Sequence, residues 1–151
     1  MGEDYAFPSA KELARASLDE LKWLKLGFGA ERVKRLCKQV AQGKLDLETL
    51  PSLSTEELRE HLIRIKWVGP GTAEGLLLWR FKRYDAFPID VWSVRIISSF
   101  YPEIKGKSPE EIKEFAKERW EDHRGLAYYY LMCGREKLSK RLNIVLDKKW
   151  K

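Results

Sequence analysis

The chain of 151 residues has the length of a single domain that buries a hydrophobic core. Its 44% of apolar and 34% of charged residues exclude an intrinsically disordered chain, and no apolar run approaches the roughly 18 residues needed to cross a bilayer. The formal net charge of +6 permits nucleic-acid binding, and it also fits a solvated surface rich in lysine and glutamate.

Cysteine and histidine are too few and too scattered for a metal site. Cys37 and Cys133 lack Cys-x-x-Cys spacing, and His61 and His123 are isolated. We therefore expect no metal site and no disulfide framework, and the sequence implies no organic cofactor. The free thiols, together with an acidic start that is no signal peptide, predict an intracellular protein of the cytoplasm, nucleoid or nucleus, with no membrane partner.

The sequence predicts one all-α domain over residues 1–151, because four Ser-x-x-Glu capping boxes mark helix starts along the chain. In each box the serine oxygen accepts an early backbone N–H bond, and the glutamate reaches back to the serine N–H. The boxes begin at Ser9, Ser17, Ser54 and Ser108. Apolar periodicity, glycines and prolines predict helices over residues 30–42, 47–53, 55–65, 72–83, 91–100, 109–121, 125–133 and 135–146.

A glycine-containing turn joins the helices predicted over 55–65 and 72–83, so the segment is a helix-hairpin-helix. Backbone N–H groups at such a turn and at the start of the second helix can hold a DNA phosphate, and the helix dipole adds attraction. This grip is independent of base sequence. We expect Val68, Gly69, Gly71 and Thr72 to bind the phosphate; the alternative is an ordinary helix–helix connection.

Residues 62–95 resemble the helix-hairpin-helix superfamily of DNA glycosylases. Val68-Gly69 and Thr72-Ala73 look like the hairpin core of that family, and Phe87-Pro88-Ile89-Asp90-Val91-Trp92 looks like its catalytic segment. Similarity extends over roughly residues 7–133, and it is nearest to the 8-oxoguanine and 3-methyladenine branches. The resemblance implies the helical fold of that family, with hairpin and catalytic segment within residues 55–100. It also implies excision repair of double-stranded DNA that carries a damaged base.

Asp90 opens the helix predicted over 91–100, where its carboxylate can cap the first N–H groups. Cleavage of a nucleotide's glycosidic bond passes through an oxocarbenium-like state. An ionised carboxylate beside the sugar stabilises that charge and can orient the attacking water. The resemblance implies this catalytic role for Asp90; the alternative is capping alone.

Several positions depart from the family pattern. Gly71 stands where bifunctional members carry a lysine that attacks the sugar, which implies a monofunctional enzyme that uses water. Trp67 stands where the family usually has the first hairpin glycine. Ala30-Glu31 replaces a pair that fills the gap left by a flipped base in several relatives, and Phe28 is either a substitute wedge or a core residue.

The chain also begins after about three helices that normally open the family's barrel. A truncated barrel exposes apolar surface, so we expect a missing N-terminal segment, a second chain or self-association to cover it.

A flipped base needs aromatic walls and polar groups that read its edge. The candidates for such a base pocket are Trp92, Trp120, Tyr128 and Tyr129, with core packing as the alternative for each. Two other functions stay open. One is a non-catalytic DNA-binding module or an inactive C-terminal fragment of a glycosylase, and the other is a helical assembly domain.

Overall fold

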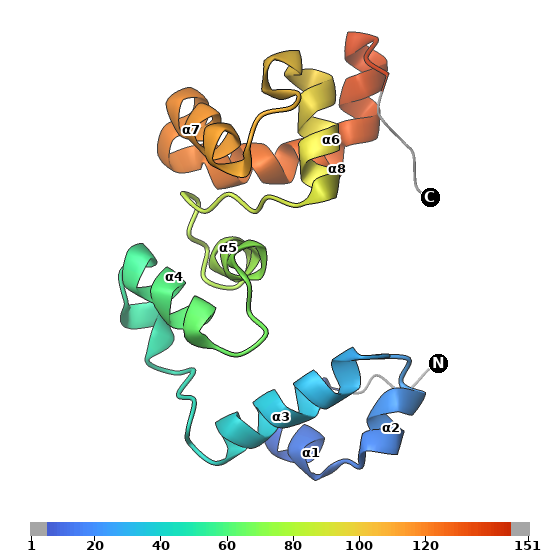
Figure 1. Cartoon of the computed structure of the whole chain (residues 1–151), viewed down its shortest axis with the longest axis vertical. Coiled ribbons are helices and arrows are strands. Elements are labelled where there is room, and N and C mark those ends of the chain that lie inside the picture. The colour runs from blue at the N-terminus through green and yellow to red at the C-terminus, as the bar shows by residue number, and fades with distance from the viewer. Residues whose placement is uncertain (1–5, 146–151) are drawn as a thin grey trace. The chain divides into compact units, whose positions relative to one another are not determined.

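The computed structural model describes residues 6–145, and within them every regular element is an α-helix or a 3₁₀ turn (Figure 1). This confirms the predicted all-α class. The chain forms two compact units, Met1–Leu53 and Ser54–Lys151. The single domain over residues 1–151 stays a prediction.

In the first unit two short helices lie against a longer one. Its elements are α1 (Ala10–Arg15), α2 (Leu18–Trp23), α3 (Gly29–Ala41) and the 3₁₀ turn η1 (Leu50–Ser52). Both α1 and α2 contact α3 (Figure 1). Leu21, Ala30 and Leu50 are at most 2% exposed. The unit therefore has a small apolar centre.

The second unit contains the hairpin and the helices that follow it. Its elements are α4 (Thr55–Arg64), α5 (Pro70–Trp79), α6 (Val91–Phe100), η2 (Pro102–Ile104), α7 (Pro109–Trp120), η3 (Glu121–His123) and α8 (Arg124–Leu142). α4 packs on α5, and both α6 and α7 pack on α8. Leu58, Leu62, Leu77, Ile97 and Ile112 are at most 3% exposed, so four helices contribute to one core.

All four predicted capping boxes are present at the starts of α1, α2, α4 and α7. At Ser54, for example, the serine oxygen accepts the Glu57 N–H at 3.3 Å and the Glu57 carboxylate accepts the Ser54 N–H at 2.9 Å. Hydrogen bonds from the serine side chain and backbone lower the pKa of each box carboxylate below its ordinary value. The four carboxylates are those of Glu12, Glu20, Glu57 and Glu111.

The two helices predicted over 125–133 and 135–146 are one continuous helix, α8, so the prediction of a break at Gly134 was wrong. Glycine inside a helix costs only about 1 kcal/mol relative to alanine. Burial of Tyr128 and Leu131 on α8 outweighs that cost. The helix ends at Asn143, which adopts a left-handed φ of 52°. Residue 146 and the acidic start at residues 1–4 lie outside the described residues.

Two other elements are shorter than predicted. α5 begins at Pro70, whose ring presets a helical φ, and ends at Trp79 rather than at residue 83. Lys82 follows with a left-handed φ of 58°, which turns the chain away from the helix axis. The helix predicted over 47–53 is reduced to the single turn η1. Within residues 6–145, no helix combines the length and apolar character that a membrane crossing requires.

Candidate active site

The turn between α4 and α5 is compact, and its outer face is accessible. The Val68 N–H donates to the Ile65 carbonyl at 3.0 Å, which closes the turn, and Gly69 is the N-cap of α5. The N–H groups of a first helical turn point out along the helix axis, where an anion can accept them. Gly69, Gly71 and Thr72 are exposed and Val68 is half-buried. Of the four residues predicted to bind a phosphate, Gly69, Gly71 and Thr72 thus lie exposed in one turn, whereas the Val68 N–H is already used inside that turn. The phosphate-binding role stays a prediction.

Trp67 adopts a left-handed φ of 73° in this turn. For a residue with a Cβ this conformation costs roughly 1–2 kcal/mol, which glycine avoids. The ring is 38% exposed, and the Lys66 ammonium lies 4.9 Å from its centroid. The turn therefore keeps a backbone conformation suited to glycine although a tryptophan stands there.

Gly71 lies directly against the segment that precedes Asp90. A Cβ built on Gly71 would stand 3.2 Å from the carbonyl oxygen of Ile89, closer than ordinary van der Waals contact. The turn predicted to bind a phosphate and the predicted catalytic segment are therefore neighbours in space as well as in sequence. The same contact gives Gly71 a structural reason to lack a side chain.

Asp90 is exposed and is the N-cap of α6, as predicted from its place before Val91. Its Oδ1 accepts the Ser93 N–H at 2.7 Å, and the Ser93 hydroxyl accepts the Asp90 N–H at 2.8 Å. This is a fifth capping box, with serine in the place of glutamate, and the sequence pattern Ser-x-x-Glu missed it. The carboxylate is thus oriented by the helix end and accessible from solvent, so capping and catalysis are compatible.

Glu74 is a residue of the site that the sequence analysis missed. It is 6% exposed on α5, its Oε2 accepts the Phe87 N–H at 2.8 Å, and its Oε1 pairs with Arg59 Nε at 2.6 Å. The signal was present in the sequence, because Glu74 is the one acid within the apolar helix predicted over 72–83. A charge at such a position must be paired when it is buried.

Two of the four candidate pocket aromatics pack against the buried Phe87 ring. Tyr128 is 5% exposed and packs edge-on against Phe87, with ring centroids 5.6 Å apart. Trp120 is half-buried and lies 6.0 Å from the same Phe87 ring. Burial raises the pKa of Tyr128 to about 12; the Asp90 charge adds to the rise and a hydrogen bond with Ser93 opposes it. Tyr128 therefore supports the Asp90 segment from within.

The other two candidates, Trp92 and Tyr129, lie beside Arg95 and Tyr130. The Arg95 guanidinium lies 5.3 Å from the Trp92 ring, and Tyr129 is 46% exposed with its ring 6.0 Å from that of Tyr130. The structure gives core packing to Trp120 and Tyr128. The base-pocket role of the four aromatics stays a prediction.

A charged hollow of about 230 Å³ lies on the second unit where α4, α5 and α7 contribute side chains. It is lined by Arg59, Glu74, Asp85, Phe87, Lys113, Glu114, Lys117 and Arg124. Four of these side chains are cationic and three are acidic, so the hollow has no strong preference for either sign of ligand. Among the described residues no cluster of three or more histidines, cysteines or acids is placed to hold a metal ion.

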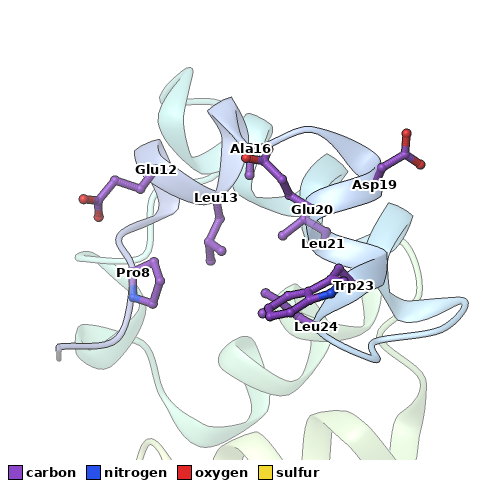
Figure 2. A pocket seen from close by; sticks show the side chains of 9 residues that line it. All are labelled: Pro8, Glu12, Leu13, Ala16, Asp19, Glu20, Leu21, Trp23 and Leu24. Atoms are coloured by element: carbon purple, nitrogen blue, oxygen red, sulfur yellow. The ribbon is translucent and has the colours of Figure 1, made fainter. Parts of the chain in front are cut away.

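An apolar groove of about 620 Å³ lies on the first unit, away in sequence from every predicted site residue. In Figure 2 the side chains of Pro8, Leu13, Trp23 and Leu24 face it, and acids stand at its edge.

Trp23 is 83% and Phe28 is 94% exposed. Core packing, one of the two interpretations of Phe28, was therefore wrong.

Comparisons with known proteins show the family to which the chain is similar. Residues 1–122 match the model of the HhH-GPD superfamily of base excision DNA repair proteins. A probable N-glycosylase/DNA lyase of Methanothermobacter thermautotrophicus is 26% identical over 76% of this chain and 36% of that protein. A putative DNA-3-methyladenine glycosylase of Bacillus subtilis, YfjP, is 24% identical over 84% of this chain and 45% of that protein.

A solved structure is similar as well. The Clostridium acetobutylicum 8-oxoguanine glycosylase/lyase, crystallised with double-stranded DNA containing cytosine opposite 8-oxoguanine, matches with a TM-score of 0.77 and 30% identity. The match covers 89% of this chain and 46% of that one. The chain therefore belongs to the HhH-GPD superfamily of base excision DNA repair proteins, which confirms the resemblance. It spans less than half the length of each of these three relatives.

Proposed function

We propose that the chain is a monofunctional DNA glycosylase, which hydrolyses the N-glycosidic bond of a damaged base flipped out of double-stranded DNA inside the cell. The approach of Gly71 to the Ile89 carbonyl carries this proposal. It brings the turn that can hold a phosphate next to the segment that ends in the Asp90 carboxylate. One compact region can then hold the strand and act on one of its sugars.

The hairpin supplies a grip without base specificity. The N–H groups at the start of α5 and the positive end of its dipole favour a phosphate oxygen. Gly69 has open space around its Cβ position, so a strand can approach the backbone closely. Neighbouring cations add a salt-dependent attraction.

Asp90 supplies the chemistry. As the C1′–N bond breaks, positive charge develops on the sugar, and an ionised carboxylate held near C1′ stabilises it. The carboxylate then accepts a proton from water as the water oxygen bonds to C1′. Ser93 fixes the direction of the Asp90 side chain through the reciprocal cap.

The absence of a side chain at Gly71 favours water as the nucleophile. A lysine amine at this position would form a Schiff base with the sugar and lead to strand cleavage. A Cβ there presses on the Ile89 carbonyl, so the close packing of the site itself disfavours such a residue.

The proposal is tested by single-turnover incubation with duplexes that each carry one lesion: 8-oxoguanine, an alkylated adenine or a deaminated base. Free base is measured by mass spectrometry, with an undamaged duplex as control. Release from at least one lesion duplex is expected. DNA binding without any release would favour the second candidate, a DNA-binding module, which the chain's coverage of under half of its relatives makes reasonable.

A second chain or self-association that completes the barrel remains a prediction. Sedimentation of the protein alone and with duplex measures the mass of the active species. Activity of a monomer would remove the need for either.

A further inference from the structure

Glu74 joins three parts of the second unit with one carboxylate. Its side chain is 8% exposed, and each of its two oxygens has its own partner. Oε1 accepts from Arg59 on α4, and Oε2 accepts from the backbone N–H of Phe87. The carboxylate itself belongs to α5, the second helix of the hairpin.

The hydrogen bond from the Phe87 N–H to Glu74 lies in the segment between α5 and α6, which contains no helix. After the turn at residues 84–85, residues 86–90 have no regular secondary structure, and Phe87 and the following Pro88 are buried. Proline has no N–H group, so the Phe87 N–H is a natural point at which a side chain can fix the backbone before Asp90. On the far side of Pro88, Ile89 lies against Gly71.

Arg59 holds the carboxylate in turn. Burial lowers the pKa of Arg59, but its hydrogen bonds and charge contacts with Glu74 and Glu56 raise that pKa by a larger amount. The pKa of Arg59 therefore lies above its ordinary value. The charged pair is therefore stable in place, whereas either charge alone would be costly at this depth. Glu56 bonds to Arg59 from the exposed side and has 71% of its side chain exposed.

We propose that Glu74 is a positioning residue, which sets the distance between the phosphate-binding turn at the start of α5 and the Asp90 carboxylate. The proposal rests on the proposed function, and it adds a residue that acts through Asp90 without touching DNA. A residue of purely structural importance would change stability alone. A positioning residue must change the chemical step, because a displacement of about 1 Å at a reacting group can cost up to about a hundredfold in rate.

The test compares three variants. Glu74→Ala removes the acceptor of the Phe87 N–H. The double variant Arg59→Met with Glu74→Gln keeps an acceptor for that N–H and removes the buried ion pair. Glu56→Gln is the matched control, because it removes only the exposed partner of Arg59. Single-turnover excision and affinity for the same lesion duplex are measured on folded protein. Amide hydrogen exchange is followed at Phe87 and Asp90.

Glu74→Ala is expected to lower the excision rate on the order of ten- to a hundredfold with little change in DNA affinity. The double variant restores most of the rate, and Glu56→Gln changes neither quantity. An unchanged rate in Glu74→Ala, or equal losses of rate and affinity, would overturn the proposal. If Glu74→Ala does not fold, Glu74→Gln replaces it. In that variant, the positioning role is rejected when exchange at Phe87 becomes faster but the excision rate does not fall.

If the unmodified protein excises no base, the proposed function fails and the positioning role in catalysis fails with it. Exchange then tests only the hold of Glu74 on the segment before Asp90. Faster exchange at Phe87 and Asp90 in the Glu74 variant, with α4 and α6 still protected, supports that hold, and unchanged exchange at both amides rejects it.

Discussion

Asp90 and Ser93 cap each other: the carboxylate accepts the Ser93 N–H at 2.7 Å while the Ser93 hydroxyl accepts the Asp90 N–H at 2.8 Å. The Ser93 hydroxyl also donates to the Asp90 carbonyl at 3.0 Å. One of these bonds holds the Asp90 carboxylate and the other two hold the Asp90 backbone, so the carboxylate that we propose for catalysis is oriented before DNA arrives.

Asp90→Asn is expected to abolish most excision and to leave DNA binding intact. Asparagine caps a helix as well as aspartate does, so α6 persists while the negative charge is lost. Loss of one such electrostatic contact lowers rates on the order of 10²–10³-fold. Single-turnover rates and duplex affinity measure the two effects, and Asp122→Asn, an exposed position on η3, is the matched control.

Gly69→Glu is expected to weaken binding of any duplex by about tenfold, because it sets a negative charge where we propose that a phosphate binds. No atom lies within 4 Å of the Gly69 Cβ position, so the side chain is accommodated. Gly69→Ala adds the Cβ without the charge and should bind almost normally. Equal affinity for all three proteins in a fluorescence anisotropy titration would remove this turn from the DNA interface.

Product DNA should carry an intact strand that breaks only on treatment with alkali. Gly71 offers no amine, so sodium borohydride should trap no covalent protein–DNA adduct. Gel electrophoresis after each treatment reads both outcomes. An adduct that disappears in Lys66→Gln would identify Lys66 as an unexpected nucleophile and contradict the monofunctional assignment.

Trp67→Gly should be more stable than Trp67→Ala by about 1 kcal/mol. Both variants lose the ring and its contact with Lys66, but only glycine relieves the left-handed φ of 73°. Urea unfolding of both variants gives the difference. If Trp67→Ala were instead the more stable variant, as alanine usually is relative to glycine, the turn would have relaxed after the loss of the ring.

Stability should fall at alkaline pH through Tyr128. Its pKa is raised from 10.0 to about 12 in the folded state, because burial disfavours the phenolate. The folded protein therefore keeps this contribution in full below pH 10 and loses it as pH rises toward 12. A shift of this size corresponds to at most about 3 kcal/mol. Tyr128→Phe should flatten the fall in unfolding free energy measured between these pH values.

The helix starts were predictable because capping is local. Ser9, Ser17, Ser54 and Ser108 each find their partner three residues along the chain, so the pattern alone identifies the bond. The helix ends were harder. Gly134 continues a helix, since neighbouring residues of α8 are buried against other helices, and that packing is invisible in a local pattern.

For the candidate site, the sequence indicated Asp90 and the hairpin but missed what connects them. Glu74 finds its partners on α4 and on the segment before α6, and the fit of Gly71 against Ile89 depends on folded backbone. The roles of the four candidate aromatics could not be separated from sequence either, since the same residue types line pockets and fill cores. Only the fold separates them, and it places Tyr128 inside.

Gly125, near the start of α8, contacts the loop that leads to Asp90. Its N–H donates to the Tyr84 carbonyl at 2.7 Å, and a Cβ on it would collide with the carbonyl oxygens of both Tyr84 and Ala86. The loop leading to Asp90 leaves the ribosome before Gly125 does. During synthesis this loop therefore gains its contacts with α8 only after Gly125 has emerged, so a chain that stops before Gly125 would carry the hairpin without these contacts.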